Sequence, residues 1–184
     1  MRTCCSHGAL CPGAPRSSEI PSRTGMGRAV AALAATLTLC CAAPAFGMTD
    51  GGEGVSFAWP ASGTVTRGFG YDPVMGEFHT GIDIGSLRSL DVRAAAPGVV
   101  EATGYAAGFD GYGNIVLVSV GPGLEALYAH LASVRVEVGD AVFAGELLGQ
   151  AGCTGYCTGT HLHFELRDDR VAFDPAPLLP ATIP

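Results

Sequence analysis

Four histidines of this sequence lie in three short segments that could carry out metal-dependent chemistry. His79 precedes Asp83 in the segment HTGID, His130 lies in YAHL, and His161 and His163 lie one residue apart in HLHFEL. Imidazole nitrogens and carboxylate oxygens are ligands that zinc binds readily. An imidazole that is not bound to metal titrates near neutral pH and can accept or donate a proton. The three segments therefore supply the groups that a metal-assisted hydrolysis needs.

The segment CTGTHLHFEL, residues 157–166, has the alternation of a β-strand with one buried face. Because successive strand side chains point to opposite faces, Glu165 shares a face with both histidines. The other face holds three apolar side chains: Leu162, Phe164 and Leu166. Glu165 could orient a metal-bound histidine, or it could be a solvated charge at the strand end. A half-exposed strand would also tolerate solvated histidines, so the pattern of this segment alone leaves both interpretations open.

The segment HTGIDIG, residues 79–85, has a similar pattern. In an extended chain His79, Gly81 and Asp83 share one face, and Gly81 has no side chain to keep a ligand away from the other two. Ile82 and Ile84 would then point into the core. An imidazole and a carboxylate that are directed at one point are either metal ligands or an ion pair.

Together, His79, Asp83 and His163 would provide three protein ligands and leave one position of a tetrahedral zinc ion open, as in catalytic zinc sites. His130 and His161 would remain unbound nearby, where they could act as general bases or stabilise charge. Two histidines and a carboxylate also bind non-haem iron in oxygenases. That iron pattern usually has one residue between the first histidine and the carboxylate, whereas three residues intervene here, so hydrolysis is the favoured interpretation.

From about Pro60 to Leu179 the sequence resembles the lysostaphin/LytM-type zinc endopeptidases, which cut peptide cross-bridges in bacterial cell walls. The resemblance rests on H-x-x-x-D in HTGID, on the histidine of YAHL and on H-x-H in HLHFEL, in this order. The flanking segments RGFGYD, AAAPGVV and GYGN fit as well. The resemblance implies a zinc endopeptidase with one ion per chain. Its zinc ligands would be His79, Asp83 and His163, and its catalytic residues His130 and His161.

Some members of this family have lost metal ligands and only activate other wall hydrolases. All five positions of the pattern are intact in this sequence, which favours an active enzyme. The alternative is a catalytically silent module that binds the wall or activates another hydrolase.

The resemblance implies an all-β fold: an antiparallel two-layered β-sandwich of hairpins, of the duplicated hybrid motif or barrel-sandwich type, with few or no helices. The sequence supports this fold independently, because residues 113–131 (GNIVLVSV, GPG, EALYAHL) have the pattern of a β-hairpin. Alternation over residues 126–134 places Tyr128 and His130 together on a polar face. Residues 134–152 alternate and break at glycines, which resembles the hairpin of lipoyl-type domains.

The N-terminal part of the chain has the composition of a secretory signal. A basic residue, Arg28, precedes an apolar run from Ala29 to Ala43, and small residues follow the run. The alternative is a transmembrane anchor, but the run is shorter than the roughly 20 apolar residues that span a bilayer. The expected organisation is a non-native or disordered extension at 1–25, a signal peptide at 26–45, a short linker at 46–59 and the zinc metalloendopeptidase domain at 60–181.

The charge of the expected mature chain limits its partners. Removal of residues 1–45 would take away four arginines and one glutamate and change the net charge from −7 to −10. Such an acidic domain is a poor partner for nucleic acids and for anionic membranes. We therefore expect a periplasmic or secreted protein that acts on peptidoglycan peptides, with no nucleic-acid partner and no stable membrane insertion after signal cleavage.

Two of the seven cysteines, Cys153 and Cys157, would remain after removal of the leader. An even pair in an exported protein predicts a disulfide, and Gly155 between them permits a tight turn. The alternative is that both cysteines bind zinc, but three other ligands already complete a site. The sequence contains no lysine, which excludes a covalently attached lipoyl or biotinyl group.

Overall fold

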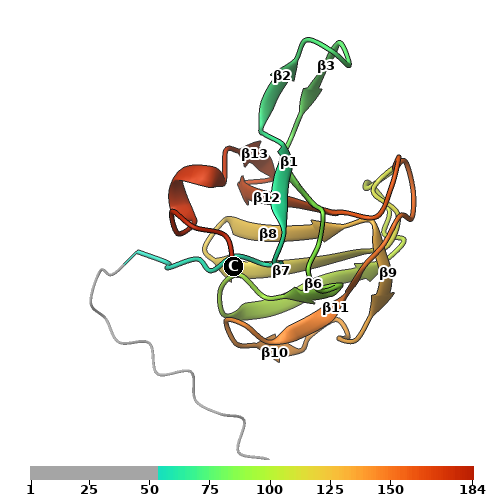
Figure 1. The fold of residues 1–184 in the computed structure, drawn as a ribbon. Coiled ribbons are helices and arrows are strands. Elements are labelled where there is room, and N and C mark those ends of the chain that lie inside the picture. The colour runs from blue at the N-terminus through green and yellow to red at the C-terminus, as the bar shows by residue number, and fades with distance from the viewer. Residues whose placement is uncertain (1–53) are drawn as a thin grey trace, which may run out of the picture. The chain divides into compact units, whose positions relative to one another are not determined.

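The computed structural model describes residues 54–184, and this part of the chain consists almost entirely of β-strands (Figure 1). The first six strands are β1 (Thr64–Arg67), β2 (Gly70–Asp72), β3 (Glu77–His79), β4 (Ile82–Gly85), β5 (Asp91–Arg93) and β6 (Gly98–Gly104). The others are β7 (Ile115–Gly121), β8 (Leu124–Ala129), β9 (Leu131–Val134), β10 (Ala141–Val142), β11 (Leu147–Ala151), β12 (Leu162–Asp168) and β13 (Val171–Phe173). Within residues 54–184 the single helical element is a short 3-10 turn, η1 (Ala176–Leu178).

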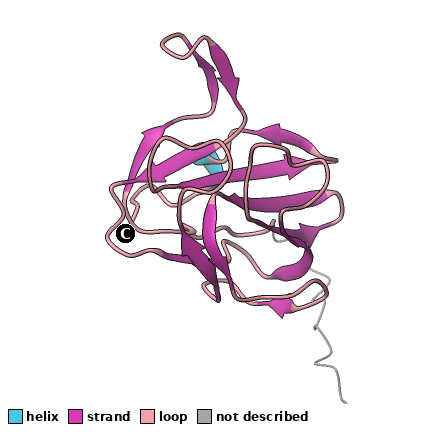
Figure 2. Ribbon diagram, turned by 90° about the vertical axis from the view of Figure 1, so that its right-hand side faces the viewer, coloured by secondary structure: helices cyan, strands magenta, loops and turns pink. Residues whose placement is uncertain are grey.

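The strands form three antiparallel sheets. The largest sheet has eight strands in the order β1-β4-β12-β8-β7-β6-β10, with β13 paired to β12. A second sheet has the order β5-β11-β9, and β2 and β3 form a separate hairpin. In Figure 1 this hairpin stands away from the two larger sheets, and Figure 2 shows the same projection from the side.

The main hydrophobic core lies between the eight-stranded and the three-stranded sheets. Fully buried side chains reach it from the large sheet, such as Ile82 and Phe164, and from the small sheet, such as Val92, Leu131 and Leu148. Burial of this apolar surface is the dominant favourable term in the stability of such a sandwich. The predicted antiparallel two-layered all-β fold is therefore confirmed.

The hairpin predicted at residues 113–131 is present as β7 and β8, which pair directly across a short turn. Both faces of β8 are buried, because Tyr128 lies in the main core while Leu127 and Ala129 pack in a second apolar cluster with Ile115. A strand that is buried on both faces has no polar face for alternation to identify.

The expectation that Tyr128 and His130 share a polar face is wrong. Tyr128 is fully buried, and its hydroxyl accepts a hydrogen bond from the Ala95 backbone N–H at 2.7 Å. His130 lies outside the strands, with a φ of 61°, at the point where the chain leaves the large sheet and enters β9 of the small sheet. The positive φ at His130, where the chain passes from one sheet to the other, takes its side chain out of the strand alternation.

Residues 134–152 do not form the separate lipoyl-like hairpin that the glycine spacing suggests. Strand β10 pairs with β6 in the large sheet, whereas β11 lies between β5 and β9 in the small sheet. Gly149 is inside β11 at an irregularity in the register, where an added Cβ would collide with the carbonyl oxygen of Ser133. This segment therefore connects the two layers.

The described part of the chain begins to pack before the predicted domain boundary at residue 60. Phe57 is buried in the core, the Ala58 N–H donates to the Ala95 carbonyl at 2.7 Å, and the Trp59 indole N–H donates to the Pro180 carbonyl at 2.9 Å. The predicted extension (1–25) and signal peptide (26–45) lie outside the described residues. Among residues 54–184, no helix has the length and hydropathy required to cross a membrane.

Candidate metal centre

Strands β4 and β12 bring two of the predicted ligands face to face. They pair antiparallel with Asp83 directly opposite His163, and His79 is supplied by the end of β3, just before β4. Gly81 lies between, where an added Cβ would collide with the carbonyl oxygen of Phe164. Glycine is therefore needed at this position for the HTGID segment to approach β12 closely.

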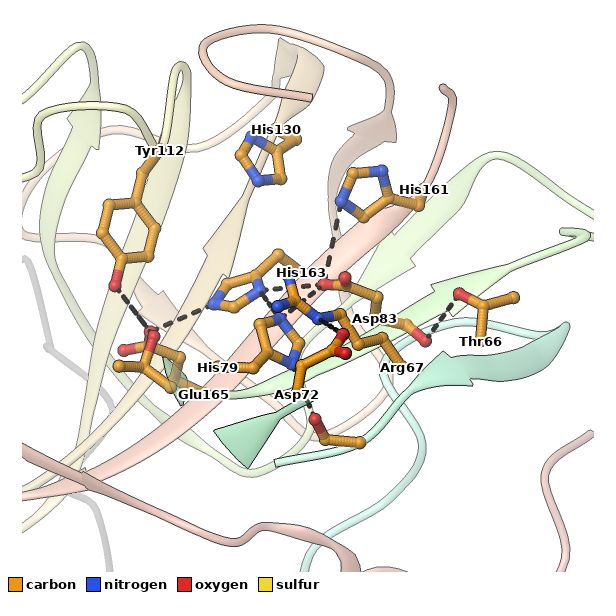
Figure 3. Close-up of polar contacts among 12 residues, drawn as sticks. Thr66, Arg67, Asp72, His79, Asp83, Tyr112, His130, His161, His163 and Glu165 are labelled. Atoms are coloured by element: carbon orange, nitrogen blue, oxygen red, sulfur yellow. Dashed lines mark hydrogen bonds and ion pairs between the residues drawn. The ribbon is translucent and has the colours of Figure 1, made fainter. Parts of the chain in front are cut away.

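The three candidate ligand atoms form a nearly equilateral triangle. His79 Nε2 lies 3.0 Å from His163 Nδ1 and 3.1 Å from Asp83 Oδ1, and His163 Nδ1 lies 2.9 Å from Asp83 Oδ1. Two ligands at 2.0–2.1 Å from a tetrahedral zinc ion are separated by roughly 3.3 Å. The donor set and its spacing therefore fit one zinc ion (Figure 3).

Hydrogen bonds to the outer ring nitrogens direct a lone pair of each candidate ligand histidine toward this triangle. His79 Nδ1–H donates to the Gly68 carbonyl at 2.8 Å, which leaves Nε2 free to bind metal. His163 Nε2–H donates to Glu165 Oε1 at 3.0 Å, which leaves Nδ1 free. Such partners fix the tautomer and the ring orientation of metal-bound histidines.

Glu165 is the most unusual of these partners, because its side chain is only 1% exposed. Besides the His163 imidazole, its Oε1 accepts a hydrogen bond from the hydroxyl of Thr80. It also accepts one from the hydroxyl of Tyr112 (Figure 3). Its other oxygen, Oε2, lies 3.6 Å from the Arg167 guanidinium. The alternative of a solvated strand-end charge is thereby excluded.

Sequence reasoning missed Tyr112 and Thr80 entirely and left the role of Glu165 open. The signal for Glu165 is its position two residues after His163 on the same strand face. Nothing in the sequence around Tyr112 and Thr80 indicates their convergence on Glu165, because residue 112 lies in a loop and 53 residues separate it from Glu165.

The pKa shifts of the metal centre follow from burial and hydrogen bonding. Burial alone would raise the pKa of Asp83 and of Glu165, but the hydrogen bonds that these carboxylates accept outweigh it and hold both values below their usual range. Burial alone would lower the pKa of His163, but its hydrogen bonds to both carboxylates raise it. The ionised Asp83 in the cleft favours a cation there, and so does the ionised Glu165 that is buried against His163 Nε2.

His130 and His161 lie next to this triangle, and each donates its Nδ1–H to a backbone carbonyl oxygen. His130 Nδ1–H donates to the Thr154 carbonyl at 2.8 Å, and His161 Nδ1–H donates to the Gly159 carbonyl at 2.7 Å. Both rings therefore keep Nε2 as a lone-pair acceptor. The ring centroids are 4.8 Å apart, and His161 Nε2 lies 3.7 Å from Asp83 Oδ1. Burial, followed by the neighbouring imidazoles, lowers the pKa of His130.

The five side chains line one open cleft of about 740 Å³. Its walls come from the β2–β3 hairpin, from the loop at residues 110–112 and from the loop at residues 156–158. Figure 3 shows His130 and His161 above the ligand triangle, with Tyr112 and Glu165 to the left of His163. A disulfide joins Cys153 to Cys157 in the last of these loops, with their Cα atoms 5.4 Å apart.

The sequence pattern that defines Peptidase family M23 matches residues 77–175, which contain all five side chains of the site. The protein belongs to peptidase family M23. The resemblance to the lysostaphin/LytM-type peptidases is thereby confirmed, and the antiparallel β fold agrees with the structures of other M23 peptidases.

The M23 domain of this chain is similar to relatives that are much longer proteins. It is 40% identical over 107 residues to the DD-carboxypeptidase/endopeptidase Mpg of Neisseria meningitidis serogroup B. The alignment covers 56% of this chain and 24% of Mpg. The aligned part therefore spans about a quarter of the length of that relative.

The solved structures that are similar to the M23 domain of this chain include two peptidases. The catalytic domain of the antimicrobial peptidase lysostaphin from Staphylococcus simulans is 32% identical, with a TM-score of 0.55, over 62% of this chain and 90% of that domain. A zinc containing peptidase from Vibrio cholerae is 27% identical, with a TM-score of 0.58, over 70% of this chain and 41% of that one.

Proposed function

We propose that this M23 peptidase is an exported zinc endopeptidase that hydrolyses peptide cross-links of bacterial peptidoglycan. The observation that carries the proposal is the arrangement of the four imidazoles. Two of them direct a lone pair, together with Asp83, at one point, and the other two keep Nε2 free in the same cleft. The names of the relatives support the class of reaction, since Mpg is an endopeptidase by name and lysostaphin an antimicrobial peptidase.

The residues suited to hold the zinc ion are His79 through Nε2, Asp83 through Oδ1 and His163 through Nδ1. Bound zinc would lower the pKa of a water molecule from about 15.7 toward 7 and polarise the carbonyl of the scissile peptide. Three protein ligands leave a position open for this chemistry, as in other catalytic zinc sites.

His130 and His161 are the groups suited to move protons during hydrolysis. The lowered pKa of His130 keeps its imidazole neutral near pH 7, so its free Nε2 can accept a proton from the attacking water. His161 lies on the same side of the ligand triangle, with its ring centroid 4.8 Å from that of His130. In its protonated form it would donate a hydrogen bond from Nε2 to the developing oxyanion, and the proton that His130 takes from the water would pass to the leaving amine.

The cellular setting is part of the same proposal. A leader at residues 26–45 would direct the protein out of the cytoplasm, and the remaining chain, with a net charge of −10, would act on peptide rather than on nucleic acid. The alternative is a catalytically silent module that has the same fold and the same cleft and also binds the cell wall, but does not hydrolyse it. Hydrolysis of peptidoglycan distinguishes the enzyme from the silent module.

The test combines zinc content with hydrolysis of purified sacculi. We expect about one zinc per chain and the release of peptides, identified by mass spectrometry, that stops with a strong chelator and returns with added zinc. His79→Ala, Asp83→Ala and His163→Ala should lose the metal, whereas His130→Ala and His161→Ala should keep it and lose roughly 10²–10⁴ in rate. Zinc without turnover in the wild-type protein would favour the silent module, and loss of zinc in His161→Ala would contradict the ligand assignment.

A further inference from the structure

The cleft above the metal centre has two raised walls that end in exposed apolar side chains. The β2–β3 hairpin presents Val74 and Met75, and Val74 is 90% exposed. The loop that follows the small sheet presents Tyr156, which is 88% exposed. The histidines of the site lie in the cleft that these side chains line, so a peptide bound for hydrolysis would lie within reach of them.

The position of Tyr156 is held by three independent features of its loop. The disulfide between Cys153 and Cys157 closes the loop around it, and its own backbone N–H donates to the Gly111 carbonyl at 2.7 Å. Its ring also lies against Gly111, where an added Cβ would come within 2.8 Å of the ring carbon Cδ2. An exposed tyrosine on a backbone held in this way loses little conformational entropy when it packs against a ligand.

The opposing hairpin is fixed by its own polar contacts. Asp72 Oδ1 accepts hydrogen bonds from the backbone N–H groups of Val74 and Met75, at 2.9 and 3.2 Å. The Arg67 guanidinium pairs with Asp72 at 2.9 Å and with Glu77 at 3.1 Å. The single arginine that lines the cleft is already paired twice, so neither wall offers a free guanidinium. The tips of the walls are apolar or aromatic, and the exposed carboxylate of Asp110 also lines the cleft.

We propose that Tyr156 is a specificity-determining residue that packs its ring against the uncharged peptide chain of the substrate. The inference rests on the proposed peptidase function and adds to it a contact outside the metal centre. The disulfide contributes by holding Tyr156 over the cleft, so the two cysteines act on substrate binding through this tyrosine.

The first test is steady-state kinetics on soluble cross-linked peptides prepared from purified sacculi. Tyr156→Ala should raise KM roughly three- to tenfold, the effect of losing one aromatic contact, with kcat within about twofold and zinc content unchanged. Tyr156→Phe, which keeps the ring, should behave like the wild-type protein. The matched control is Tyr105→Ala, because Tyr105 is also strongly exposed, at 73%, but does not line the cleft.

The second test removes the disulfide. Cys153→Ser/Cys157→Ser should also raise KM at constant zinc content, and combining it with Tyr156→Ala should add little, since both changes remove the same contact. An unchanged KM in Tyr156→Ala, or an equal rise in Tyr105→Ala, would overturn the inference while leaving the peptidase function intact.

A wild-type protein that releases no peptide would instead contradict the proposed function. The same variants are then compared by sedimentation with purified sacculi. Weaker binding of Tyr156→Ala than of Tyr105→Ala would support the contact, and equal binding would overturn it.

Discussion

Glu165 is the residue on which the orientation of the metal centre depends most directly. A carboxylate with 1% exposure is destabilising unless it is paired and hydrogen-bonded, and this one accepts bonds from His163, Thr80 and Tyr112. Burial, the largest cause, raises the pKa of Tyr112 to about 12, so its hydroxyl stays protonated and remains a donor to Glu165. The network holds the His163 ring in the tautomer that binds metal through Nδ1.

Replacement of Glu165 by glutamine should weaken zinc binding. Glu165→Gln keeps the shape of the side chain but removes the negative charge that receives His163 Nε2–H, and changes of this kind typically cost 10- to 100-fold in metal affinity. Competition with a chromophoric chelator measures the affinity without reference to activity. Glu101→Gln, at an exposed position of β6, is the control. Equal zinc affinity in both variants would show that Glu165 has only a structural role.

Zinc affinity should fall as the pH falls. In the zinc-free protein the hydrogen bonds to Asp83 and Glu165 outweigh burial and raise the pKa of His163, so zinc must displace a proton from this ring. The same raised pKa contributes stability to the zinc-free protein below about pH 6.5 that is lost as the pH rises through the folded value. Competition titrations between about pH 6 and 8 should show up to roughly tenfold weaker binding per unit of acidification. A pH-independent affinity would contradict this linkage.

At the scale of elements, strand β12 carries the site and the disulfide loop leads into it. β12 places Leu162, Phe164 and Leu166 in the core. On its other face His163 lines the cleft and Glu165 is buried against the His163 ring, and His161 lies just before the first residue of the strand. The loop from Cys153 to Cys157 ends shortly before this strand. It therefore affects the cleft more directly than it affects the core.

Loss of the disulfide should produce only a modest loss of stability. A closed loop of this length corresponds to about 2 kcal/mol in the chain-entropy account. Urea unfolding of Cys153→Ser/Cys157→Ser at fixed zinc concentration measures the change in the free energy of unfolding. A much larger loss, or loss of zinc, would show that the loop supports the core or the metal ligands instead of the cleft wall. Thiol alkylation with intact-mass analysis checks that the wild-type protein has no free thiol at these positions.

At the scale of the whole molecule, the metal centre joins segments that are distant in the chain. His79 and His163 are 84 residues apart and come from different sheets of the described part of the chain. The unfolded chain does not hold these side chains together, so zinc would bind mainly to the folded state. Binding of this kind stabilises a protein in proportion to the logarithm of the ligand concentration.

Zinc should therefore raise the thermal stability of the protein. At free zinc of about 1,000 times the dissociation constant, the gain is about 4 kcal/mol in the free energy of unfolding. Calorimetry of the wild-type protein with chelator and with excess zinc measures the difference in Tm. His163→Ala should lose this dependence, whereas Tyr105→Ala should retain it. A wild-type Tm that is unaffected by zinc would argue against a preformed site.

Much of the fold and the candidate site follows from local pattern. Strand alternation places His163 and Glu165 on one face and the apolar residues on the other, and the glycines and hydrophobic runs predict antiparallel hairpins. Local pattern fails where a strand is buried on both faces, as at Tyr128, and where the chain changes sheets, as at His130. The alternation of apolar and polar residues identifies the buried face of a strand only when the other face is exposed. When both faces are buried, the alternation is lost and does not show where a side chain points.

By itself, the sequence determined the residue types of the site, their order and the all-β class, because these depend on chemistry and on periodicities of a few residues. Only the tertiary structure decided that Glu165 is buried, that Tyr112 reaches it and that Tyr156 stands over the cleft. Those contacts join residues tens of positions apart in the chain. Their distances depend on how two sheets and three loops pack together, which no local spacing specifies.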